Sequence, residues 1–226
     1  MRRATRAALV VLAVCVVQDR AVSAQSSDAE PGRLELAFGT RWIGSQPLGS
    51  RPATETTPAS GTLTLFESSS TLNSVPGFEG RVGWRIARSL TAEAEASFAQ
   101  PDLAIAITKD AEGAPATTLV ERVQQFTIGG ALVWSLPVGA RRVRPFVTGG
   151  GGYLRQLHEN ATLVQTGRYY QFGGGVTVLL ASRPDSFLRA MGLRIDARGI
   201  VRVDGVAFDS TTRLTPAAGA SFFVRF

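Results

Sequence analysis

Apolar and polar residues alternate with a period of two along much of the chain, and this alternation predicts β-strands. The clearest case is residues 214–226 at the end of the sequence, where Phe222, Val224 and Phe226 share one face. The opposite face carries small residues and Arg225. We therefore expect a closing strand with one face suited to lipid.

Eight segments show this alternation. They span residues 33–43, 78–86, 90–98, 125–134, 143–154, 168–180, 191–203 and 214–226. The pattern predicts an all-β fold, an eight-stranded antiparallel up-and-down transmembrane β-barrel.

The connections between these segments alternate in length. The short ones are residues 87–89, 135–142 and 181–190. The longer, mostly polar ones are residues 44–77, 99–124, 155–167 and 204–213. Short turns at one end and long loops at the other are the topology of an outer-membrane barrel, with both termini on the periplasmic side.

Two further stretches, residues 62–66 and 103–108, also look strand-like. Residues 103–108 are out of phase with the strand before them, and Pro101 lies between the two. We interpret them as an arm of a hairpin that extends above the membrane. A ten-stranded barrel is the competing interpretation.

The second face of the strands is polar and charged, and we expect it to line the lumen. The expected lumen charge network is Glu35, Arg41, Glu79, Arg81, Arg85, Glu93, Glu95, Arg144, Arg194, Asp196, Arg198 and Arg225. The turn at residues 87–89 should place Arg81 opposite Glu95. Buried charges must be paired, so the network predicts a plugged lumen. A narrow channel for ions or small solutes is the alternative.

Aromatic residues of the apolar face cluster near the strand ends, which is where a membrane-spanning barrel places its interfacial girdles. The expected membrane-interface aromatics are Trp42, Phe78, Trp84, Phe98, Phe126, Trp134, Tyr153, Tyr170 and Phe226. They favour a membrane barrel over a soluble, lipocalin-like, lipid-binding barrel, which would turn its apolar face inward.

The first residues predict export. Residues 1–24 combine a basic start, an apolar run and a small-residue cleavage site, which is the pattern of a secretory signal peptide. Its removal takes away four Arg and one Asp and lowers the formal net charge from +6 to +3. We therefore expect no nucleic-acid partner. Residues 25–226 form the expected barrel domain.

The stretch RPFVTGGGGYLRQ at residues 144–156 and the terminal ASFFVRF complete this picture. With the signal peptide and the eight strands, the chain resembles the small outer-membrane β-barrel proteins of Gram-negative bacteria, the OmpA/OmpX/OmpW-like group. The resemblance implies contact with outer-membrane lipids and lipopolysaccharide. It also implies that the barrel-assembly machinery reads Phe222, Val224 and Phe226 as an insertion signal.

Catalytic chemistry finds little support. His158 is the only His, and we expect it to be exposed in a loop. A lipid-modifying barrel enzyme would need a His-x-Ser pair, whereas Asn160 follows His158 at that spacing. The only Cys, Cys15, lies in the predicted signal peptide, so we expect no metal and no cofactor. The expected role is structural, or the binding of a surface ligand through residues 44–77 and 99–124, without enzymatic activity.

Overall fold

The computed structural model describes residues 32–57, 61–138, 142–158, 164–183, 185–203 and 213–226. The predicted signal peptide, residues 1–24, lies outside the described residues. The strands in these ranges are β1 (Leu34–Ile43), β2 (Gln46–Thr57), β3 (Gly61–Leu72), β4 (Val75–Arg85), β5 (Leu90–Ala99), β6 (Asp102–Thr108), β7 (Thr117–Ser135), β8 (Val143–His158), β9 (Val164–Ser182), β10 (Ala190–Val203) and β11 (Leu214–Arg225). No helix within these ranges has the length and apolar character needed to cross a membrane.

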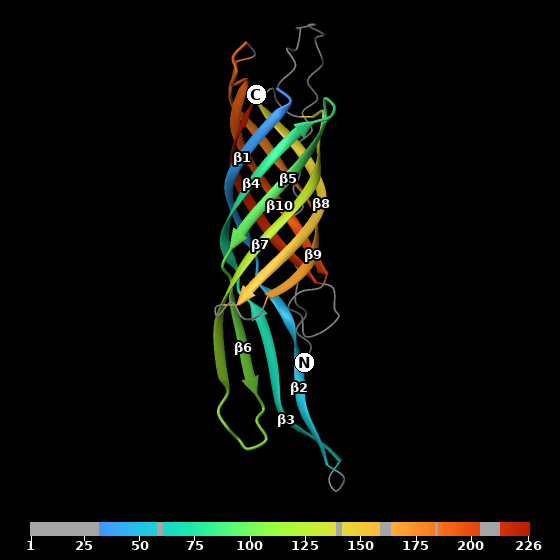
Figure 1. The fold of residues 1–226 in the computed structure, drawn as a ribbon, viewed down its shortest axis with the longest axis vertical. Coiled ribbons are helices and arrows are strands. Elements are labelled where there is room, and N and C mark those ends of the chain that lie inside the picture. Colours follow the sequence, from blue (N-terminus) through green and yellow to red (C-terminus); the bar gives the residue numbers. More distant parts are fainter. Residues whose placement is uncertain (1–31, 58–60, 139–141, 159–163, 184, 204–212) are drawn as a thin grey trace, which may run out of the picture.

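Eight of these strands form a closed antiparallel barrel (Figure 1). Its order is β1, β4, β5, β7, β8, β9, β10 and β11, and β11 pairs with β1 to close the ring. The register of the closing pair runs from Glu35 opposite Arg225 to Ile43 opposite Ala217. The eight-stranded prediction is confirmed, and the ten-stranded alternative is wrong.

The remaining strands form a second sheet that continues beyond one end of the barrel (Figure 1). This extension consists of β2, β3, β6 and residues 117–122 of β7, paired in that order. The hairpin arm predicted at residues 103–108 is therefore confirmed as β6. Residues 46–57 were expected to be part of the long, polar connection 44–77, and they contain Pro47 and Pro52. They lie in β2 at the edge of the sheet, where proline is tolerated.

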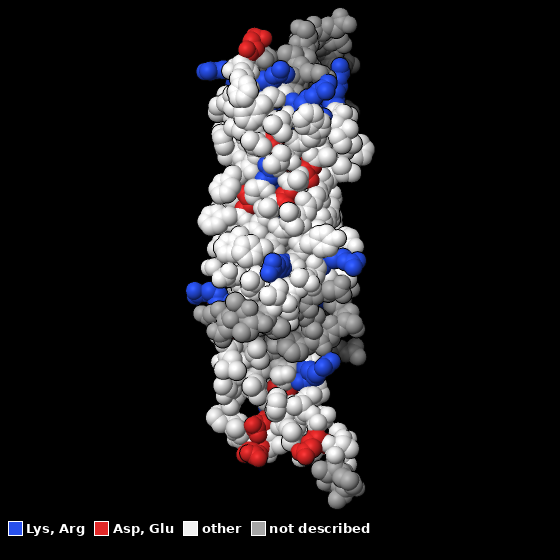
Figure 2. Space-filling view, in the orientation of Figure 1, with Lys and Arg blue, Asp and Glu red and all other residues white. Residues whose placement is uncertain are grey.

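The apolar face of the barrel strands points outward. Along β11 exposed and buried residues alternate, and Phe222 is 44% exposed while its neighbour Phe223 is fully buried. On the visible side, the outer wall of the barrel is mostly uncharged: basic side chains lie toward its two ends, and a few acidic and basic atoms show between uncharged side chains midway along it (Figure 2). A lipocalin-like barrel needs the opposite arrangement, so the fold is that of a transmembrane barrel.

Candidate functional site

The lumen holds a cluster of eight charged side chains, each at most 7% exposed. We call this cluster the lumen network: Arg41, Glu79, Arg81, Glu93, Glu95, Arg194, Asp196 and Arg198. Four members are cations and four are anions, so the cluster is formally neutral. They come from β1, β4, β5 and β10, because alternation turns every second residue of these strands inward.

The centre of the network is held by direct ion pairs. Arg198 donates through Nε to Asp196 Oδ2 at 2.5 Å and through Nη1 to Glu95 Oε2 at 3.1 Å. Arg41 Nη2 lies 2.6 Å from Glu79 Oε2 and 3.4 Å from Glu95 Oε2. Each of the three carboxylates therefore has at least one guanidinium within contact distance, as buried charges require.

Arg81 has the cross-strand neighbour that was predicted, but its side chain pairs with other residues. The register of β4 and β5 places it opposite Glu95, as expected from the turn. Its guanidinium, however, contacts Glu79 and donates to Asp196 Oδ1 at 3.0 Å. The contact with Asp196 joins β4 to β10 across the lumen.

Arg194 lies at the end of the network that is nearest the short turns. Its Nη1 donates to Glu93 Oε1 at 2.5 Å, and its guanidinium carbon lies 4.2 Å from the centre of the Phe146 ring. A guanidinium over an aromatic face is attracted by the ring electrons, so Phe146 stabilises a charge as well as filling space.

Neutral side chains from β9 complete the coordination of Glu95. The Tyr169 hydroxyl donates to Glu95 Oε1 at 2.9 Å, and Gln171 Nε2 donates to the same oxygen at 2.6 Å. Neither residue was predicted to line the lumen, although alternation from Tyr170, which was expected to face lipid, already implies that Tyr169 faces inward.

The structure does not bring every expected charge into this cluster. Glu35 and Arg225 form a separate pair, with Oε2 and Nε 2.6 Å apart, at the end of the barrel where the termini of β1 and β11 meet. Arg85 is half-buried at the end of β4. Arg144 is exposed. It is the second residue of β8, at the short-turn end of the barrel and on the same strand face as the buried Phe146, so its place in the lumen charge network stays a prediction.

Toward the extension the lumen becomes less charged. Leu154, Tyr169, Ile200 and Ala217 form one buried cluster. Leu48, Leu72, Leu103 and Val123 form a second, at the base of the extension. Gln156 Nε2 donates to Gln125 Oε1 at 3.2 Å. Between the lumen network and the extension, the barrel interior is therefore filled by apolar and amide side chains.

His158 is not an exposed loop residue, contrary to the expectation. It ends β8, its side chain is only 11% exposed, and its Nδ1 lies 2.9 Å from Glu121 Oε1. The register of β7 and β8, with Val123 opposite His158, brings Glu121 within reach. Its other ring nitrogen, Nε2, is buried and makes no hydrogen bond within the described part of the chain.

The extension is largely exposed, and its surface carries ion pairs beside apolar side chains such as Leu63, Leu119 and Val120. Lys109 Nζ lies 2.5 Å from Glu67 Oε2, and this hydrogen bond raises the pKa of Lys109. Arg122 Nε lies 3.8 Å from Asp102 Oδ1. Because both pairs are exposed to solvent, they contribute little to stability.

Most of the expected interface aromatics point outward. Trp42, Phe78, Trp84, Phe126, Trp134, Tyr153 and Tyr170 are each exposed by 43% or more. Phe98 and Phe226 are half-buried, since Phe98 packs against Phe126 and Phe226 against Phe187. Within the described ranges no group of three or more His, Cys, Asp or Glu side chains is placed to hold a metal ion.

Comparison with solved structures identifies the fold. Neisserial surface protein A matches with a TM-score of 0.54 and 11% identity, over 85% of this chain and 97% of that one. The attachment invasion locus protein Ail of Yersinia pestis matches with 9% identity and a TM-score of 0.40, over 85% of this chain and 99% of that one. No protein-family model and no curated protein matches the sequence. The chain therefore has the fold of the eight-stranded outer-membrane β-barrels.

Proposed function

We propose that this chain is an integral outer-membrane β-barrel protein with a structural or surface-interaction role, and that paired charges plug its lumen. The main support for this proposal is the lumen network, whose charges sum to zero. An eight-stranded barrel leaves an interior that side chains can fill, and here four guanidinium groups and four carboxylates occupy it. Moving any one of them leaves a buried charge without its partner, which costs several kcal/mol.

The surface role belongs to the extension. It presents the edges and faces of four strands beyond the barrel, and the long connections that were expected to bind a ligand are the segments that form it. The buried apolar cluster at its base holds these strands in a fixed arrangement, which a binding surface needs. Outer-membrane lipids, lipopolysaccharide and the barrel-assembly machinery remain the proposed partners of the barrel, with export through residues 1–24 and insertion guided by Phe222, Val224 and Phe226.

The proposed role is not catalytic. His158 and Glu121 form a hydrogen-bonded pair near the barrel mouth, but a lipid-modifying barrel enzyme of the kind considered above needs Ser where this chain has Asn160.

A narrow channel is the second candidate. Arg81, Arg194 and Arg198 each keep buried N–H groups that make no hydrogen bond within the described residues. Buried donors of this kind are commonly paired with water, which favours a hydrated lumen.

Single-channel recording in planar bilayers separates plug from channel. We expect no conductance steps from the wild type. The double variant Glu95→Ala with Arg198→Ala removes an adjacent anion and cation while keeping the lumen neutral, and we expect it to conduct. Asp102→Ala with Arg122→Ala removes an exposed pair of the extension and should stay silent. Steps from the wild type would contradict the plug, and silence of the lumen variant would show that other side chains close the barrel.

A further inference from the structure

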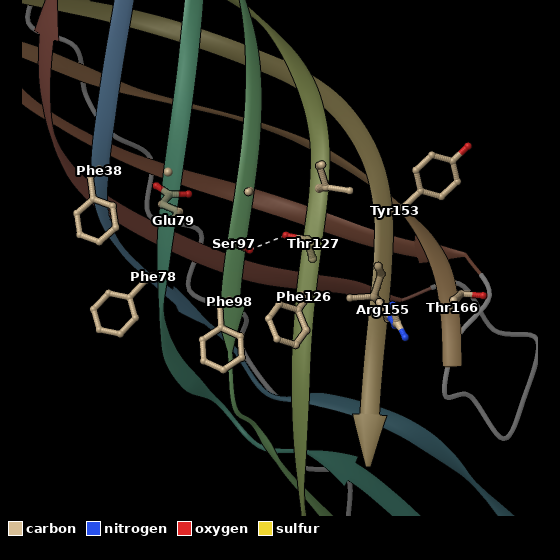
Figure 3. A pocket seen from close by; sticks show the side chains of 14 residues that line it. Phe38, Phe78, Glu79, Ser97, Phe98, Phe126, Thr127, Tyr153, Arg155 and Thr166 are labelled. Atoms are coloured by element: carbon tan, nitrogen blue, oxygen red, sulfur yellow. Dashed lines mark hydrogen bonds between the residues drawn. The ribbon is translucent and has the colours of Figure 1, made fainter. Parts of the chain in front are cut away.

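A groove of about 650 Å³ lies on the outer wall of the barrel, across β4, β5 and β7 (Figure 3). Its walls are mainly aromatic and aliphatic side chains that point away from the lumen: Phe38, Phe78, Phe98, Phe126, Ile128 and Tyr153. Gly80 and Ala96 form its floor. The volume is within the range of about 300–1,000 Å³ that is usual for small-molecule sites.

Strand register creates this groove. Phe78, Phe98 and Phe126 are cross-strand neighbours, so their rings form one continuous ridge, and the rings of Phe98 and Phe126 are 4.7 Å apart. In the next outward row Gly80 pairs with Ala96, and a Cβ built on Gly80 would meet no atom within 4 Å. Phe38 and Ile128 flank these two small residues in the same row, so the gap between them, beside the ridge of rings, leaves a trough open to the surrounding lipid.

Two arginines stand at the end of the groove toward β8 and β9. Arg155 lines the groove and pairs with Phe126 across the strands, while Arg168 pairs with Tyr153. Both arginines are exposed on the outward face, and the register makes them diagonal neighbours. Neither makes an ion pair within the described residues. Neighbouring like charges on one sheet face repel each other, so the pair favours an anion.

The groove and the arginines select one kind of occupant. Arg155 lies near the end of β8 that adjoins the extension, where the outer-leaflet headgroups would be. A second copy of the chain would present the same cations and would not neutralise them. We propose that the groove binds an acyl chain of a phosphate-bearing lipid of the outer leaflet, and that Arg155 and Arg168 hold its phosphate. This inference rests on the proposed membrane placement, with the extension outside.

Native mass spectrometry of the detergent-purified protein with lipid A tests this proposal. Arg155→Gln with Arg168→Gln removes the cations, and Ala96→Phe fills the floor of the groove. We expect each variant to bind at least about tenfold more weakly than the wild type, which corresponds to the loss of charge-assisted hydrogen bonds or of the acyl-chain contact.

Matched controls lie elsewhere on the barrel. Arg88→Gln with Arg183→Gln removes two exposed cations at the short-turn end, and Ala197→Phe adds a ring to the outward face of β10. Both should bind lipid A as the wild type does.

Several results would overturn the proposal. They are unchanged binding by either test variant, equal binding of dephosphorylated lipid A, displacement of the lipid by inorganic phosphate, or a dimer that Ala96→Phe abolishes. Heat-modifiable migration on gels checks that every variant is folded. The measurement needs no membrane placement, so a failed lipid site and a failed outer-membrane role give different results.

Discussion

Gly219 shows, at the scale of one residue, how a narrow lumen accommodates so many charges. It lies on the inward face of β11, and a Cβ there would lie 3.2 Å from Glu79 Oε1 and 3.4 Å from Asp196 Oδ1. β11 therefore leaves space into which side chains from β4 and β10 reach. The glycine therefore gives the ion pairs room, since a side chain added here would lie closer than ordinary contact to a carboxylate oxygen of Glu79.

We expect Gly219→Val to destabilise the folded barrel by about 1–3 kcal/mol, because overpacking displaces Glu79 and Asp196 from their guanidinium partners. The temperature at which the folded band disappears on a detergent gel measures this. Gly149→Val is the matched control, because a Cβ on Gly149 meets no atom within 4 Å. Equal melting of the two variants would show that the space beside Gly219 is not needed.

The extension is the element-scale feature that distinguishes this chain from a bare barrel. Its strands pair in the order β2, β3, β6 and β7, and β7 runs without interruption from the extension into the ring. At its base, Leu48, Leu72, Leu103 and Val123 contribute one side chain from each strand to a buried cluster. That cluster holds the four strands together where they leave the barrel.

We expect Leu72→Ala to loosen the extension and to leave the barrel intact. Removing a buried leucine side chain costs about 2–5 kcal/mol, and here the loss is confined to the apolar base. Hydrogen exchange of β2 and β3 should increase, while heat-modifiable migration should not change. Leu63→Ala lies on the same strand and removes a side chain that is 57% exposed, so it should alter neither. Unchanged exchange in Leu72→Ala would contradict the role of the cluster.

The whole molecule has two different ends. The ring strands are linked by short connections at one end, such as the turn between β4 and β5, and the first residues of β1 and the last residues of β11 also lie at that end. At the other end the extension continues the sheet (Figure 1). In an outer-membrane barrel the short turns lie in the periplasm, so we expect the extension to lie outside the cell.

Cysteine labelling on intact bacteria tests this orientation. The only native Cys is Cys15, in the predicted signal peptide, so introduced thiols report one site each. We expect Thr64→Cys, in the extension, to react with a membrane-impermeant maleimide. Arg88→Cys, in the turn after β4, should react only after the membrane is permeabilised. The reverse pattern would place the extension on the periplasmic side.

Particular residues show how far the sequence determined this protein. The alternation of residues such as Phe222 and Phe223 depends only on the geometry of a single strand, so it revealed the eight barrel strands, the outward apolar face and most inward charges. The tight turn at residues 87–89 also determined a register, which correctly placed Arg81 opposite Glu95. Both are local properties, and local chain geometry is enough to decide them.

Tertiary structure alone decided the partners. Ring closure brings Asp196 to Arg81 across 115 positions of sequence, and the pairing of β7 with β8 brings Glu121 to His158. β2 has no alternation of its own and is a strand because β3 pairs with it. The outer groove likewise exists because Gly80 and Ala96 fall side by side next to a ridge of phenylalanines. Such contacts depend on register and closure between distant strands, which no single stretch of sequence specifies.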